Sequence, residues 1–141
     1  MIEHLIIAAL AAVLSEEPLH PGPAADELTR RTYEVVASRG PAYAACTAGL
    51  AVYDVAQASS PKLVATLFFP GSASAISLSG DLAFLSMGPE GLKIIDISRP
   101  AEPLLIGSLD TDGSVNAAVP VARDRLIIAD GVMGLKVADI S

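Results

Sequence analysis

The sequence has few of the side chains on which catalysis and metal binding usually depend. It contains one cysteine, Cys46, and two histidines, His4 and His20, both near the N-terminus. The lone cysteine cannot form an intrachain disulfide, and these three residues cannot build a structural zinc site. Without a histidine after residue 20, neither a Ser-His-Asp nor a Cys-His arrangement can form in the rest of the chain. The sequence therefore predicts no catalytic residues, no metal site and a protein that is not an enzyme.

Basic and aromatic residues are also scarce. Nine Lys and Arg against 16 Asp and Glu give a net charge of −7, and aromatic residues make up 4% of the chain, with no tryptophan. Such a surface repels phosphate backbones and anionic lipids, and it offers few rings on which bases can stack. Nucleic acid and membrane surfaces are therefore not expected as partners. Hydrophobic residues, by contrast, make up 52% of the 141 residues, enough for the core of one domain or of part of a larger one.

The N-terminal segment has the composition of a targeting sequence. Residues 1–15 include an unbroken apolar run, Leu5–Leu14, which is too short to span a membrane but matches the core of a signal peptide. Glu3 stands where a signal peptide normally carries Lys or Arg, so an N-terminal helix is the alternative. Residues 16–32 form a proline-rich linker. We therefore expect export to the periplasm, cell surface or medium, with a cytoplasmic location as the alternative, and no transmembrane helix.

One short phrase occurs three times in the remainder of the chain, at spacings of 42 and 43 residues. The three copies are Gly49–Asp54, Gly91–Asp96 and Gly134–Asp139. Around each copy, short β-branched and aliphatic runs alternate with Gly, Pro, Asp and Ser, which is typical of strands joined by turns. Both faces of the central phrase are mostly apolar. Four short antiparallel strands that recur every 40 to 45 residues, covered on both faces, indicate all-β blades of a β-propeller.

The repeat resembles that of the LVIVD-repeat family, and the copy GLKIIDISRPAEP, from Gly91 to Pro103, is the most similar. The resemblance covers about residues 33–141 and implies propeller blades at about 33–73, 74–114 and 115–141. Members of this family are typically extracellular or cell-surface propellers without an assigned activity. The first copy departs from the pattern at Tyr53 and in the turn after it.

The strands do not add up to a closed propeller. About 2.75 blades are present, whereas closed propellers have about 4 to 8. An open arc exposes apolar blade faces and an unpaired strand edge. We therefore expect further blades, supplied by a continuation of the chain past Ser141, by other copies in a homo-oligomer, or by a second protein.

Two residue types recur in every copy of the phrase. Gly49, Gly91 and Gly134 precede a strand and suit a turn that needs a positive φ angle. Asp54, Asp96 and Asp139 end that strand, where a carboxylate can accept hydrogen bonds from the amides of the following turn. A functional site is usually formed once in a protein, whereas residues that stabilise the fold recur in every blade. The repeated glycines and the repeated aspartates are therefore both predicted to be structural.

Strand alternation places the remaining polar residues on two loop faces. One face is predicted to be acidic and to bind a cation, a small ligand or a basic protein, with a solvated rim as the alternative. Lys93 and Lys136, near the starts of strands, would weaken its charge. Asp110 and Asp112 are reminiscent of a calcium loop, but the third carboxylate and the bidentate Glu are missing, so a turn is favoured and no cofactor is expected. The candidate binding residues on this face are Glu90, Asp110, Asp112, Asn116 and Asp130.

Taken together, these features predict a non-enzymatic, exported propeller protein that acts as a binding or protein-interaction scaffold. Two alternatives stay open. One is a propeller hydrolase or lyase whose catalytic residues lie partly outside this chain, and the other is a self-assembling structural protein.

Overall fold

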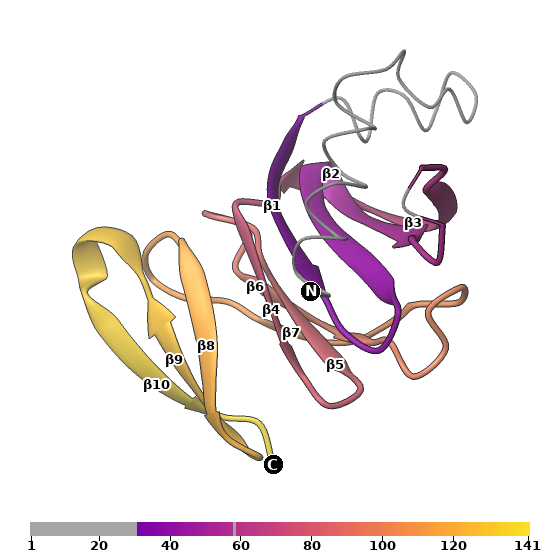
Figure 1. Cartoon of the computed structure of the whole chain (residues 1–141). Helices are drawn as coiled ribbons and strands as arrows, with labels where there is room; N and C mark the ends of the chain where they lie inside the picture. Colours follow the sequence, from indigo (N-terminus) through magenta and orange to yellow (C-terminus); the bar gives the residue numbers. More distant parts are fainter. Residues whose placement is uncertain (1–30, 58) are drawn as a thin grey trace.

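A computed structural model describes residues 31–57 and 59–141. The expected signal peptide or helix at 1–15, and all but the last two residues of the expected linker, lie outside the described residues. Within the described residues, the regular elements are ten β-strands and one 3₁₀ turn, η1 (Gly131–Met133). The strands form three antiparallel sheets that follow one another along the chain and stand side by side (Figure 1).

Each sheet corresponds to one copy of the sequence repeat. Sheet 1 has the order β1-β2-β3, sheet 2 the order β4-β5-β6-β7, and sheet 3 the order β8-β9-β10. The strands of sheet 1 are β1 (Thr32–Ala37), β2 (Pro41–Asp54) and β3 (Lys62–Ser72). Those of sheet 2 are β4 (Ala75–Ser79), β5 (Leu82–Ser86), β6 (Leu92–Asp96) and β7 (Leu104–Leu109). Those of sheet 3 are β8 (Ala117–Ala122), β9 (Arg125–Ala129) and β10 (Leu135–Asp139).

Sheet 2 is the complete unit, and the four strands expected from the sequence are all present. Sheet 1 differs, because β2 is a single strand of 14 residues where two strands were expected. The part of β2 up to Cys46 pairs with β1, and the part from Thr47 onward pairs with β3. Sheet 3 has three strands, and its copy of the repeat phrase forms β10 at the edge of the sheet.

The apolar core lies between the sheets, because alternate residues of each strand point to opposite faces. The central strand β5 shows this clearly. Leu85 is fully buried in the cluster shared with sheet 1, while its neighbour Phe84 is buried in the cluster shared with sheet 3. A third cluster, which includes Cys46 and Tyr53, occupies the other face of sheet 1. Sheet 2 is thus covered on both faces, as a blade in the middle of an arc must be.

The first strands of the three sheets lie next to one another and are joined by polar contacts. The amide of Ile76 in β4 donates to Glu34 Oε2 in β1 at 2.6 Å, and Ser77 Oγ donates to the carbonyl of Ala118 in β8 at 2.6 Å. A backbone bridge also joins Gly88 to Val115. These contacts fix the sheets relative to one another, and so they fix the loops at the sheet ends.

Candidate binding surface

In the first two copies of the phrase, a side chain at the repeated glycine would collide with the next strand. Gly49 lies within β2 rather than in the turn expected from the sequence. Gly91 has φ +81°, and a Cβ atom there would overlap the carbonyl oxygen of Leu109 in β7. A Cβ atom on Gly49 would likewise overlap the carbonyl oxygen of Leu67 in β3. Gly134 also has φ +81°, yet no heavy atom lies within 4 Å of the Cβ position. The difference follows from the topology, because no strand pairs with the outer edge of β10 in the described part of the chain.

The repeated aspartates close the turn after each phrase. Asp54 Oδ1 accepts a hydrogen bond from the amide of Ala56 at 2.9 Å, and Asp96 and Asp139 do the same for Ser98 and Ser141 at 2.8 Å. Hydrogen bonding by the side chain of Ser98, and after it by its amide, holds the pKa of Asp96 below its usual range, and Ser141 does the same for Asp139. All three carboxylates therefore stabilise the turns that follow them.

The candidate binding residues lie in loops of sheets 2 and 3, but they do not form one group. Glu90 lies between β5 and β6, and Asp110, Asp112 and Asn116 lie between β7 and β8. These four residues are exposed. Asp112 comes together with Asp130, the fifth candidate, through a shared lysine, whereas Glu90 and Asn116 have no part in that contact.

Asp130 requires a correction, because its side chain is fully buried rather than exposed on a loop face. Thr111 Oγ1 donates a hydrogen bond of 2.5 Å to Asp130 Oδ1, and Lys136 Nζ lies 3.1 Å from Oδ2. The loop before β8 also covers this residue, since a Cβ on Gly113 would overlap the Asp130 carbonyl oxygen. Asp130 therefore joins the β7–β8 connection to sheet 3 and is unavailable to a ligand.

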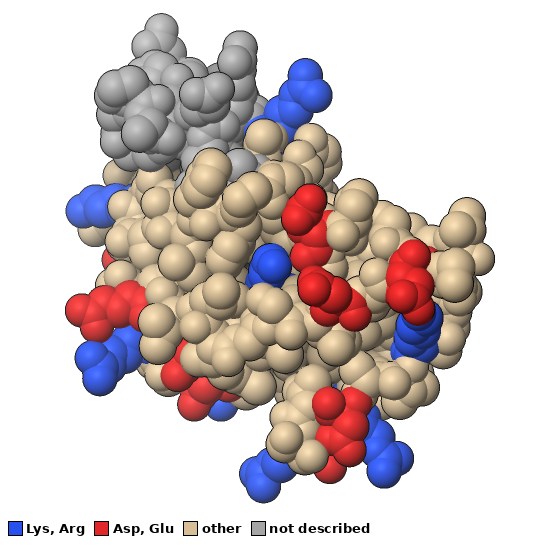
Figure 2. Space-filling model, turned by 180° about the vertical axis from the view of Figure 1, so that it is seen from behind, with Lys and Arg blue, Asp and Glu red and all other residues tan. Residues whose placement is uncertain are grey.

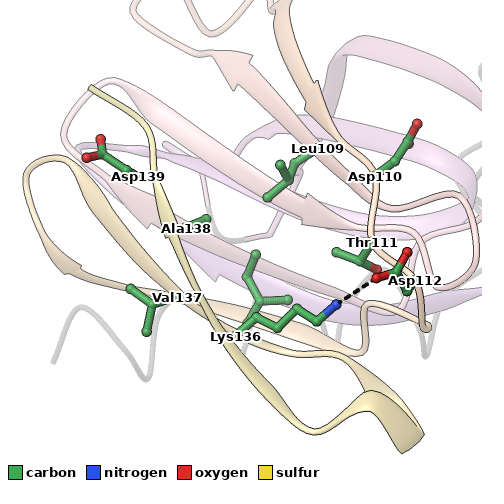
Figure 3. Close-up of a pocket in the computed structure, with 9 residues that line it drawn as sticks. Leu109, Asp110, Thr111, Asp112, Lys136, Val137, Ala138 and Asp139 are labelled. Atoms are coloured by element: carbon green, nitrogen blue, oxygen red, sulfur yellow. Dashed lines mark ion pairs between the residues drawn. The ribbon is translucent and has the colours of Figure 1, made fainter.

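Lys136 is the residue whose role the sequence reasoning missed. Its side chain extends from β10 toward the β7–β8 connection and lies 3.5 Å from Asp112 Oδ2 as well as 3.1 Å from Asp130 (Figure 3). The hydrogen bond and charge of Asp130 raise the pKa of Lys136, so it stays cationic at neutral pH. The sequence did contain an indication of this role. Successive residues of a strand point to opposite faces, so Lys136 lies on the face opposite to Leu135 and Val137, which is the face toward sheet 2.

The carboxylate of Asp130 links stability to pH. The Thr111 hydroxyl, and after it Lys136, lower the pKa of Asp130 despite its burial. A group whose pKa is lower in the folded than in the unfolded state stabilises the fold above its usual pKa, and this contribution is lost as the pH falls through the folded value. We therefore expect Asp130→Asn to be less stable than the unmodified protein at pH 7, and the gap to shrink below about pH 4. Urea unfolding of both proteins from pH 7 to pH 3 measures this, and a constant gap would contradict it.

A hollow of about 270 Å³ lies beside Lys136, between the end of β7 and β10 (Figure 3). Its walls combine the acidic and basic groups described above with apolar side chains of both sheets. The lining residues are Leu109, Asp110, Thr111, Asp112, Ile128, Lys136, Val137, Ala138 and Asp139. The hollow is therefore lined by apolar side chains together with charged groups.

Metal and thiol chemistry find little support in the described part of the chain. No three His, Cys, Asp or Glu residues among residues 31–57 and 59–141 are grouped so that they could hold a metal ion. Cys46 is buried in sheet 1, and burial raises the pKa of its thiol. A thiol that stays protonated at neutral pH is a poor nucleophile.

None of the described helical segments is long and apolar enough to cross a membrane.

The outer face of sheet 3, directed away from sheet 2, carries four exposed aliphatic side chains. Leu135 is 69% and Val137 65% exposed on β10, and Val119 and Val121 on β8 are each more than half exposed. The equivalent residues of the other phrases are covered by the following sheet. These are Leu50 and Val52 in sheet 1, and Leu92 and Ile94 in sheet 2.

On the face of the molecule shown in Figure 2, the charged side chains lie in small separate groups with uncharged areas between them. On the opposite set of loops, basic residues pair with acids: Arg39 Nη1 lies 3.2 Å from Asp81 Oδ1, and Arg99 Nη1 lies 3.1 Å from Glu102 Oε2. The preference of the acidic loops for a cation or basic partner stays a prediction.

Stacked antiparallel sheets, each built from one copy of a 42- to 43-residue repeat, define the chain as a set of β-propeller blades. The sequence matches the LVIVD repeat over residues 29–67 and 70–111, which is more than half of the chain. The chain therefore belongs to the LVIVD-repeat family. The third copy of the phrase, in sheet 3, follows these two matches.

Solved structures with the same fold include two computationally designed proteins. Ika8 superposes with a TM-score of 0.63 at 12% identity over 77% of this chain, and Ika4 with 0.61 at 16% identity over 78%. This chain spans 33% of the length of Ika8 and 66% of that of Ika4. At such identities the likeness shows the fold alone. No curated protein matches the sequence.

Proposed function

We propose that this protein is an exported, non-enzymatic interaction scaffold whose main contact surface is the outer face of sheet 3. The observation that carries the proposal is the exposure of this face. A contiguous surface with several large aliphatic side chains more than half exposed is unusual for a monomer and is typical of a binding surface. Full burial of each such side chain contributes about 1.5–3 kcal/mol, so covering the face would release substantial free energy.

The remainder of the fold supports this role by holding the face rigid. Phe84 of sheet 2 and Leu126 of sheet 3 are buried in one cluster between the two sheets. Lys136 pairs with Asp112, and Asp130 accepts a hydrogen bond from Thr111, so both residues connect sheet 3 to the β7–β8 connection. A surface that is already ordered loses little conformational entropy when a partner binds, which favours affinity.

The two other candidate functions have less support. Residues 31–57 and 59–141 contain no histidine and no group of three metal-ligating side chains, which gives less support to a hydrolase or lyase that depends on histidine or a metal. Self-assembly uses the same apolar face with another copy as the partner. When no other partner is present, the scaffold proposal also expects this face to associate with another copy, so the experiment below tests both.

Replacing Val137 by lysine tests the proposal. We expect the unmodified chain to associate with increasing concentration, because its exposed face can be covered by another copy. Val137→Lys should stay monomeric, since an ammonium group at the centre of the contact cannot be desolvated cheaply. The measurement is molar mass by light scattering after size exclusion at several concentrations. Val64→Lys is the matched control, because Val64 is an exposed valine on β3, away from this face. Association that persists in Val137→Lys, or a chain that is monomeric throughout, would contradict the proposal.

A further inference from the structure

The chain contains two Asp-Gly pairs, Asp112–Gly113 and Asp130–Gly131. In such a pair the amide nitrogen of the glycine can attack the side-chain carboxyl carbon of the aspartate, because glycine has no Cβ atom to hinder the approach. A carbon–nitrogen bond forms, one water molecule leaves, and a five-membered succinimide ring results. Water then opens the ring at either carbonyl. One product is aspartate again, and the other is isoaspartate, in which the former side-chain carboxyl carbon is part of the backbone.

The fold holds the carboxyl group of Asp130 away from this reaction. The side chain is fully buried, Thr111 Oγ1 donates a hydrogen bond to its Oδ1, and Lys136 Nζ lies 3.1 Å from its Oδ2. The carbonyl of Asp130 also accepts a hydrogen bond from the amide of Met133 at 3.1 Å, which fixes the backbone around the pair. Both carboxylate oxygens therefore have partners that keep this group from turning toward the amide of Gly131.

Asp112 is far less restrained, although it lies in the same part of the fold. Its side chain is 86% exposed, and its carboxylate lies 3.5 Å from Lys136 Nζ. An ion pair with so exposed a member contributes little free energy, so this contact opens readily. Asp112 and Gly113 lie in the β7–β8 connection, outside the strands. The amide of Gly113 donates to the Asp130 carboxylate, so ring closure requires a local opening of this connection and is slow.

We propose that Asp112 is a site of spontaneous isoaspartate formation, and that the fold directs this reaction to Asp112 and spares Asp130. The product has one more methylene group in the backbone, and its free carboxylate is attached directly to Cα. The carboxylate that pairs with Lys136 is thereby displaced. Asp112 and Lys136 both line the hollow between β7 and β10 (Figure 3), so the reaction changes the charge distribution and shape of this hollow. This inference does not depend on the proposed contact surface of sheet 3.

Prolonged incubation of the full-length chain at neutral pH tests the inference. Isoaspartate is detected by methylation with an isoaspartate-specific methyltransferase and is located by fragmentation mass spectrometry of tryptic peptides. In the folded protein we expect the isoaspartate content to rise with time at Asp112 and to stay absent at Asp130. In guanidinium chloride, where the fold no longer holds Asp130, both Asp-Gly pairs should react.

The variant Asp112→Glu should lose the signal at this position, because glutamate would have to form a less favourable six-membered ring. Asp110→Glu is the matched control. Asp110 is exposed in the same connection but is followed by Thr111, whose side chain hinders the attack, so this variant should leave the signal at Asp112 unchanged. Two results would overturn the inference. One is a folded chain without isoaspartate at Asp112 under conditions in which the unfolded chain reacts, and the other is equal yield at Asp112 and Asp130 in the folded protein.

Discussion

Gly91→Ala is expected to lower the free energy of unfolding by about 3–5 kcal/mol, whereas Gly134→Ala should cost about 1–3 kcal/mol. Both glycines have φ +81°, so the backbone strain of an alanine is the same at both positions. At Gly91 the new Cβ also overlaps the carbonyl of Leu109, so β7 must shift away from β6. At Gly134 no such neighbour exists.

Urea unfolding of the two variants isolates the contribution of the fourth strand, because strain is common to both. A larger loss at Gly91 is the result expected from the geometry. Equal losses would mean that strain alone explains the repeated glycines, and that the open space at Gly134 has no structural meaning.

Phe84→Ala is expected to destabilise the protein by about 3–5 kcal/mol and to release sheet 3 before the other sheets unfold. Phe84 is 1% exposed and is the one aromatic side chain in the cluster between sheets 2 and 3. In repeat structures each unit contacts only its neighbours, so the loss of one interface acts locally. The neighbouring substitution Leu85→Ala removes a contact between sheets 1 and 2 instead and should cost about 2–5 kcal/mol.

Amide exchange under native conditions distinguishes the two variants. In Phe84→Ala, protection should fall mainly in β8, β9 and β10, and in Leu85→Ala it should fall mainly in β1, β2 and β3. The pair is well matched because the residues are adjacent in one strand and both are fully buried. An identical pattern of lost protection in the two variants would show that the three sheets unfold as one unit, contrary to this description.

Much of the fold could be predicted because it depends on local periodicity. The phrase Gly91–Asp96 forms a strand that is covered on both faces and ends at a closing aspartate, and the contact of that aspartate recurs in all three copies. The glycine and aspartate positions could therefore be interpreted from the sequence. The division of sheet 1 could not, since nothing local to Thr47 indicates that β2 continues through it.

The site was harder to predict because it depends on contacts between units. Asp130 looks like an exposed loop acid in the sequence, but the β7–β8 connection folds over it and Lys136 compensates its charge. The partners Thr111 and Lys136 lie 19 and 6 residues away, so no spacing rule identifies them. The apolar character of the outer face of sheet 3 followed more directly from the sequence, because Leu135 and Val137 occupy the same positions of the repeat phrase as Leu92 and Ile94 of sheet 2.

Amide hydrogen exchange on the full chain at low and at high protein concentration tests the role of the sheet 3 surface most directly. If this surface is where partners bind, exchange should slow with concentration in β8 and β10, which carry Val119, Val121, Leu135 and Val137, and should be unchanged in β4 and β6. Slowing in β8 and β10 alone is the predicted result. Exchange in these two strands that is independent of concentration, or slowing centred on sheet 1, would contradict the assignment of this surface as the contact site.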